Sequence, residues 1–347
     1  MTLVAGVNVG GLLAFIGDLL LSWRIPSAVD LPTQSAVHVR PGLHGDHAAG
    51  LGQKLHIIRP YLLLGWAGEH VEAVRIIREL EKLLPATQSE LDDLDPAFEI
   101  LNSCRDGTEM VVTVIKDGAI QTFDVRTRSF ELDNKRIYLL GSGAPDFFEY
   151  LQTHPDILPS QQAANSLVAQ AVLLRFAARA FTLQWILGEG LSASWGGGFE
   201  IAFPTEDGFK KIDKLLCRAW LIDAAGNYHN SGRSFFLRYY GSDLFLSCFN
   251  PNERTYVVPS HVGTPVEVPE KEQINPEWTL DMFVLAKTGS FVEFARFQPP
   301  HRPVIDRLVL TKGAVTGWHL DREYVEQRVE QALAESGRGE QFRMFRY

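Results

Sequence analysis

The sequence contains little cysteine, with three residues among 347. Cys104, Cys217 and Cys248 are widely spaced and odd in number, so they form neither a disulfide framework nor a zinc-site pattern. This usage is typical of a reducing compartment and predicts a cytoplasmic protein. The stretch 38–47 holds three histidines and Asp46, but no helix or strand spacing fixes them as ligands, so a solvated loop is favoured over a metal site. No metal and no cofactor are expected.

The sequence also lacks dense runs of lysine and arginine. Its 33 basic residues are outnumbered by 42 acidic residues, which gives a net charge of −9. Such a chain is poorly suited to phosphate-rich surfaces, so neither nucleic acid nor an anionic membrane is an expected partner.

A long apolar run is missing near the N-terminus. Asp18 interrupts the apolar residues there before they reach the roughly 20 that a membrane helix needs. No basic segment precedes them and no small-residue cleavage site follows, so a signal peptide is not expected either.

What the first residues do contain is a hairpin pattern. Two short apolar runs flank the turn signal at 8–11, Asn-Val-Gly-Gly, which predicts two antiparallel strands. Thr2 stands at the start of the first strand. Removal of Met1, which precedes a small residue, would leave Thr2 with a free amine beside its hydroxyl, and such a residue can be nucleophile and base together. The alternative is an ordinary strand residue.

Apolar periodicity predicts the elements that follow. Two strands should meet near Arg59-Pro60, followed by helices over 69–84 and 90–103, strands at 109–115, 120–125 and 136–140, helices after 144 and over 160–187, and a strand at 199–203. The first helix should carry its apolar residues on one face: Val71, Val74, Ile77, Leu80 and Leu84. Two sheets with helix pairs outside satisfy this order, which predicts an α+β fold, a four-layer αββα sandwich.

Residues 205–347 are expected to form a separate region after a first domain at 1–204. This C-terminal region should complete the second sheet and add a β-rich module that ends in a helix over about 321–335.

Five stretches, in order along the chain, resemble proteasome β subunits and the bacterial HslV-type peptidase. They are the Thr2 strand, Gly17-Asp18, the segment 54–63 (Lys-Leu-His-Ile-Ile-Arg-Pro-Tyr-Leu-Leu), Ala67-Gly68, and Gly141-Ser142-Gly143. The resemblance covers roughly residues 2–204 and implies a hydrolase with an N-terminal nucleophile.

The resemblance also implies a role for each site residue. Thr2 would be the nucleophile, with Asp18 and Lys54 beside it. A lysine favours the deprotonated hydroxyl and a carboxylate orients the lysine, although an ordinary salt bridge is the alternative. Gly68 would donate its N–H to an oxyanion. Ser142 would hydrogen-bond near the Thr2 amine, or alternatively cap the next helix.

The substrate pocket that the resemblance implies would be lined by Leu21, Ser22, His56, Trp66, His70 and Val74. Trp66 is large enough to shorten this pocket. The alternative is that Trp66 is an ordinary core residue. The chain departs from the family where Asp-x-x-Ser-Gly-Gly is usual, because residues 192–198 read Ser-Ala-Ser-Trp-Gly-Gly-Gly. The loop before Lys54 is also longer than in the family. If Gln53 rather than Lys54 faces Thr2, the site would be inactive.

The sequence therefore predicts a cytoplasmic threonine-type peptidase that acts on polypeptides or peptides. A self-compartmentalising homo-oligomeric ring and an ATPase unfoldase are the expected partners. Two alternatives stay open: a non-catalytic proteasome-like subunit for assembly or binding, and an amidohydrolase of the same superfamily acting on a small amide.

Overall fold

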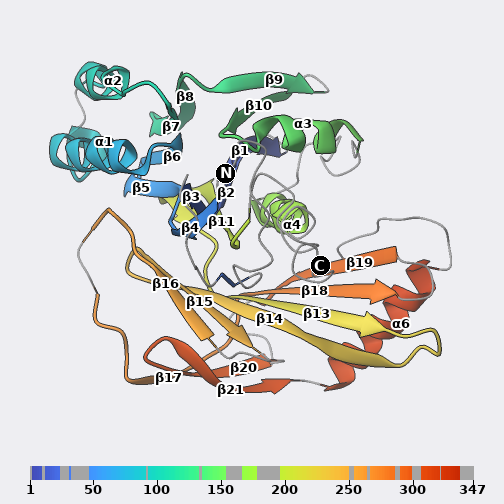
Figure 1. Ribbon diagram of the computed structural model, residues 1–347. Helices are drawn as coiled ribbons and strands as arrows, with labels where there is room; N and C mark the ends of the chain where they lie inside the picture. The colour runs from blue at the N-terminus through green and yellow to red at the C-terminus, as the bar shows by residue number, and fades with distance from the viewer. Residues whose placement is uncertain are drawn as a thin grey trace. The chain divides into compact units, whose positions relative to one another are not determined.

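The computed structural model describes residues 2–9, 12–23, 31–32, 47–90, 93–132, 135–153, 166–177, 196–249, 254–263, 266–285, 290–298, 306–320 and 322–336. The chain divides into two compact units (Figure 1). Unit 1 comprises Met1–Leu173, Gly188–Ile212 and Pro259–Thr264. Unit 2 comprises Leu174–Leu187, Asp213–Val258 and Pro265–Tyr347.

Unit 1 is organised around the N-terminal hairpin. Strands β1 (Val4–Val9) and β2 (Leu12–Asp18) pair antiparallel in the middle of a six-stranded sheet of order β12-β11-β2-β1-β10-β9. The other strands are β9 (Arg128–Leu132), β10 (Lys135–Leu140), β11 (Phe199–Thr205) and β12 (Gly208–Lys211). Because the hairpin has neighbours on both sides, Thr2 is buried at its start.

A second sheet of unit 1 faces the first across an apolar core. Its strands run in the order β5 (Leu55–Arg59), β6 (Leu62–Gly68), β7 (Thr108–Lys116) and β8 (Ala119–Val125). Val4 and Phe15 of the hairpin pack with Leu63 and Val111 of this sheet. A small sheet of β3 (Leu20–Trp23) and β4 (His47–Leu51) completes the strands of the described part of unit 1.

The helices among the described residues are α1 (His70–Leu83), α2 (Asp95–Asn102), α3 (Ala144–Thr153), α4 (Ser166–Ala177) and α6 (Arg322–Ser336), with a short 3-10 turn at Gln88–Glu90. Helix α1 buries Ala73, Ile76 and Leu80 against the four-stranded sheet. Val71, expected on that face, is 80% exposed. At about 100° per residue, Val71 lies on the opposite side from Ala73.

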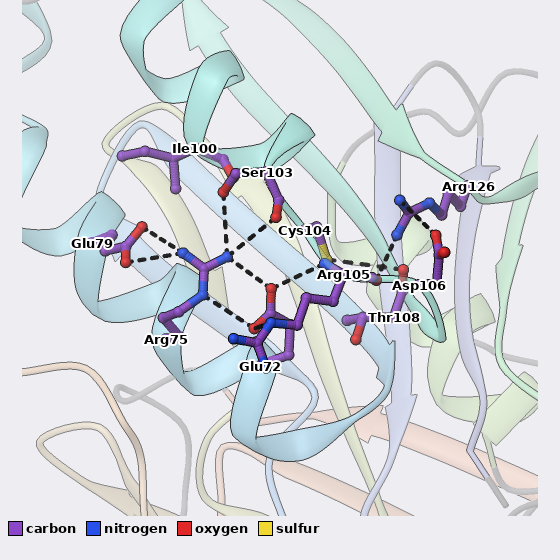
Figure 2. Close-up of polar contacts among 10 residues, drawn as sticks. All are labelled: Glu72, Arg75, Glu79, Ile100, Ser103, Cys104, Arg105, Asp106, Thr108 and Arg126. Atoms are coloured by element: carbon purple, nitrogen blue, oxygen red, sulfur yellow. Dashed lines mark hydrogen bonds and ion pairs between the residues drawn. The ribbon is translucent and has the colours of Figure 1, made fainter.

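A charged network joins α1 to α2 and to the start of β7 (Figure 2). Arg75 donates to the buried Glu72 at 2.7 Å and to Glu79 at 2.9 Å, and the backbone nitrogen of Arg105 donates to Glu72 at 3.0 Å. The hydrogen bond from Arg75 lowers the pKa of Glu72 to about 2. The network therefore fixes α1, which begins directly after β6.

Unit 2 is built on a second six-stranded sheet of order β16-β15-β14-β13-β18-β19. Its strands are β13 (Leu215–Ile222), β14 (Tyr228–Tyr240), β15 (Asp243–Phe249), β16 (Arg254–Val258), β18 (Trp278–Leu285) and β19 (Ser290–Phe297). Helix α6 packs Val325 and Val329 against Trp220 and Phe283. A three-stranded sheet of β17 (Lys271–Ile274), β20 (Asp306–Thr311) and β21 (Ala314–Leu320) packs on β13 and β14.

The predicted four-layer αββα sandwich is wrong. In the described part of the chain, strands account for 52% and helices for 23%, and the strands form five sheets with few helices. Strands β17, β18 and β21 were not predicted. Strand β18 reads Trp-Thr-Leu-Asp-Met-Phe-Val-Leu, and Asp281 breaks its apolar pattern. That carboxylate is buried because Arg218 of β13 pairs with it, a contact that the sequence does not reveal.

In the described residues, no helix combines the length and the apolar character required to span a membrane.

Candidate active site

Thr2 is held at the start of β1 by the turn that follows β10. The Thr2 nitrogen donates to Ser142 Oγ at 3.2 Å, and the Gly143 nitrogen donates to the Thr2 carbonyl at 3.0 Å. Gly141 has φ +92°, and a Cβ there would lie 2.2 Å from the Thr2 carbonyl oxygen. Only glycine therefore allows this close approach. The turn fixes both backbone polar groups of Thr2, and the Ser142 hydroxyl accepts from Thr2.

Asp18 lies at the end of β2, beside the residue that follows Thr2. It is fully buried, and its two carboxylate oxygens accept hydrogen bonds from the backbone nitrogens of Leu3 at 3.0 Å and Gly196 at 3.1 Å. Burial raises the pKa of Asp18 to about 6, against the opposing effect of the Lys54 charge and of these two donors. The pKa of Asp18 therefore lies close to neutral pH.

Lys54 directly precedes β5 and is also fully buried. Its Nζ donates to the Leu20 carbonyl at 2.9 Å and lies 5.0 Å from the centroid of the Trp66 ring. Burial lowers the pKa of Lys54, while the charges of Asp18 and Glu200 act in the opposite direction. Within the described residues, Lys54 and Asp18 share no direct hydrogen bond and interact through their charges.

Gln53 hydrogen-bonds to Trp66 and Lys211. Its carbonyl accepts from Trp66 Nε1 at 3.1 Å, and its side-chain oxygen accepts from Lys211 Nζ at 2.7 Å. The residue that interacts electrostatically with Asp18 is therefore Lys54 and not Gln53.

Gly68 ends β6 with φ +99°, and a Cβ there would lie 2.0 Å from the Gly107 carbonyl oxygen. None of the described contacts joins Gly68 to Thr2. Ala67, which precedes Gly68, lies near the turn that holds Thr2: a Cβ placed on Gly141 would be 3.2 Å from Ala67 Cβ.

The residues expected to line a substrate pocket fall into two groups. Trp66, His56 and His70 lie together: Trp66 Nε1 is 3.2 Å from His56 Nε2, and the rings of Trp66 and His70 are 5.6 Å apart. Trp66 belongs to the core under α1 and is fully buried. Leu21 packs against the core that contains Trp66, whereas Ser22 lies in β3 and Val74 is half-buried on α1.

A histidine that was not predicted joins this cluster. His261, from the segment Pro259–Thr264, places its Nε2 2.9 Å from His70 Nε2, and its ring is 6.0 Å from that of His56. Burial lowers the pKa of His70 and holds that of His56 well below its ordinary value. The sequence offers no signal for His261 because 191 residues separate it from His70.

Two further charged residues at the site were also missed. Glu200 in β11 accepts from the backbone nitrogens of Lys54 and Leu55, and Lys211 in β12 donates to Glu200 at 2.6 Å. A glutamate inside the apolar strand Phe-Glu-Ile-Ala-Phe was the one signal available.

Some predicted positions lie outside the described residues. These are 192–195 of the Ser-Ala-Ser-Trp stretch and His38, His44 and Asp46 of the histidine-rich stretch, whereas His47 begins β4. Among the residues that are described, no group of three or more histidine, cysteine, aspartate or glutamate side chains could hold a metal ion.

Comparison of the chain with models of known protein families gives no match, and neither does comparison with curated proteins.

Proposed function

We propose that the chain is a threonine-type peptidase whose nucleophile is Thr2, made N-terminal by removal of Met1. The observation that carries this proposal is the buried Lys54–Asp18 pair beside the start of β1. The ammonium of Lys54 has a lowered pKa and donates to a backbone carbonyl rather than to a carboxylate. The resemblance to proteasome β subunits and the HslV-type peptidase supports the same assignment.

In the proposed reaction, the Thr2 hydroxyl oxygen attacks the carbonyl carbon of the scissile bond. Its proton passes to the free Thr2 amine, and from there to the leaving amine of the substrate. The positive charge of Lys54 favours the deprotonated hydroxyl, and Asp18 keeps that charge in place. Water then hydrolyses the ester on Thr2, which releases the acid product and restores the hydroxyl. Ser142 Oγ holds the nitrogen that acts as base.

The remaining parts of the proposal rest on the resemblance alone. They are a homo-oligomeric ring that encloses the site, an ATPase unfoldase that delivers polypeptide, and the N–H of Gly68 as oxyanion donor. The proposed cytoplasmic location rests on the cysteine usage.

The test is covalent labelling of the purified protein with a peptide β-lactone, after its intact mass has shown the loss of Met1. We expect a single adduct, on the peptide that begins with Thr2. Thr2→Ala should abolish it and Thr2→Ser should retain part of it. Lys54→Met should slow it by ~10²–10⁴-fold, the range of proton-transfer assistance. Thr113→Ala, which removes another fully buried threonine, is the matched control and should label normally.

Two results separate the alternatives. Absence of the adduct on a protein that begins with Thr2 would leave the non-catalytic subunit. An adduct together with cleavage of small amides but not peptides would identify the amidohydrolase. A protein that retains Met1 is tested as a cleaved fusion that starts at Thr2.

A further inference from the structure

A second buried carboxylate lies beside the proposed catalytic lysine. Glu200 in β11 is fully buried, and its Oε1 accepts two backbone hydrogen bonds, from the nitrogens of Lys54 at 2.5 Å and Leu55 at 2.8 Å. Its Oε2 accepts from Lys211 Nζ at 2.6 Å. Glu200 therefore holds the main chain in place at the start of β5 through these two hydrogen bonds.

Gly17 lies next to Glu200 and Lys54. Glu200 and Gly17 face each other across the β11–β2 pairing, and Gly17 directly precedes Asp18. A Cβ on Gly17 would lie 3.2 Å from Lys54 Cβ and 3.5 Å from Glu200 Cγ. Glu200 and Lys54 therefore both pack against the residue that precedes Asp18.

Lys211 occupies the second carboxylate oxygen of Glu200. Its Nζ bonds to Glu200 and to the side-chain oxygen of Gln53, and burial lowers the pKa of Lys211 while the charge of Glu200 acts in the opposite direction. With Oε2 engaged by Lys211, Glu200 bonds to the backbone of Lys54 and not to its ammonium. The ammonium bonds instead to Leu20.

We infer that Glu200 is a positioning residue for the proposed reaction, and that Lys211 holds it in that role. Glu200 fixes the backbone of Lys54 so that the ammonium stays near Asp18 and the start of β1. The inference rests on the proposed function, because the position of Lys54 matters only if Thr2 reacts.

The test compares three variants at Glu200 and Lys211. Glu200→Ala removes the carboxylate oxygen that accepts both backbone hydrogen bonds, and we expect acylation of Thr2 to slow by ~10²-fold, the effect of misplacing a catalytic group by about 1 Å. Glu200→Gln keeps an oxygen for the two nitrogens but removes the charge. It should stay within about tenfold of wild type, and the loss of rate at high pH should move to lower pH, because Lys54 loses a charge that raises its pKa. Lys211→Met should also slow acylation, whereas Lys210→Met on the same strand should not.

Hydrogen exchange of the peptide that contains Lys54 and Leu55 provides a readout that does not need activity. Glu200→Ala should speed the exchange of these amides and Glu200→Gln should leave it near wild type. A merely structural glutamate would lower the melting temperature without moving the pH profile.

The possible failures are distinguishable. If the wild type acylates Thr2 and folded Glu200→Ala does so at the same rate, the positioning role is wrong and the proposed function stands. Should Glu200→Ala not fold, an unchanged pH profile in Glu200→Gln overturns the inference. If the wild type itself is not acylated, the proposed function fails and the inference falls with it.

Discussion

Each unit of the molecule contains a buried pair of opposite charges, and the two pairs are built differently. In unit 2, Arg218 donates to Asp281 from Nε at 2.6 Å and from Nη2 at 2.8 Å, and Trp220 Nε1 adds a bond at 2.9 Å. In unit 1, Lys54 and Asp18 are as deeply buried but hydrogen-bond to backbone groups instead of each other.

Under the proposed function, this difference distinguishes a structural pair in unit 2 from a pair that assists the reaction in unit 1. The bidentate pair uses both carboxylate oxygens of Asp281 and fixes the guanidinium plane, which favours one rigid arrangement of β13 and β18. The separated pair leaves Asp18 with a raised pKa and Lys54 with a lowered one. Displaced pKa values of this kind are typical of groups that take part in proton chemistry.

The strongest test of this contrast removes one cation from each pair. Arg218→Met should cost ~3–5 kcal/mol of unfolding free energy, because Asp281 is left buried without its partner. Lys54→Met should cost clearly less, since Asp18 keeps two backbone donors and its pKa, already raised by burial, rises further without the Lys54 charge, so that the carboxyl can take up a proton. Urea unfolding at pH 7.5 measures both. Replacing both residues in Arg218→Met/Asp281→Leu should recover most of the loss, and equal losses in the two single variants would remove the distinction.

A smaller effect should appear in the pH dependence of stability. The pKa of Asp18 is raised to about 6 in the folded chain, so the folded state favours the protonated carboxyl. The stability that this group contributes is fully present below about pH 4, its unfolded pKa, and is lost as the pH rises through 6. The difference between the folded and unfolded pKa values corresponds to about 3 kcal/mol of unfolding free energy. Urea unfolding between pH 4.5 and 7.5 should show this decline in wild type and not in Asp18→Asn, and parallel curves would contradict it.

The smallest effect should come from an exposed pair that serves as a reference. Lys210 and Asp207 are 2.7 Å apart, with side chains that are 53% and 78% exposed. Solvent screens such pairs, so Lys210→Met should change the unfolding free energy by only ~0–1 kcal/mol and leave acylation of Thr2 unchanged. A larger loss in either measurement would show that proximity of charges, rather than burial, governs the other two results.

The sequence was most informative where the relevant contacts are local. The turn signals around 8–11 and at Arg59-Pro60 predicted the hairpins β1–β2 and β5–β6, because strand pairing across a short turn depends on nearby residues. The resemblance named Thr2, Asp18 and Lys54 through motifs that are contiguous in the chain, and their chemistry remains a prediction.

The contacts that the sequence did not reveal join distant segments. Glu200 lies 146 residues from Lys54, and Lys211 lies 158 residues from Gln53. No periodicity in a single strand can show which residue lies opposite on another strand. The fold class was missed for the same reason, because the arrangement of the strands in five sheets depends on pairing between segments far apart in the sequence, such as β13 and β18.

The segment Pro259–Thr264 has a consequence for the order in which the protein matures. It belongs to unit 1, although the chain on both sides of it belongs to unit 2. On the ribosome, a nascent chain that has just completed β12 still lacks His261, the partner of His70, and Val262, which packs into the core under α1. Unit 1 therefore cannot finish folding until much of unit 2 has been synthesised, and its maturation is coupled to translation of a region that follows it.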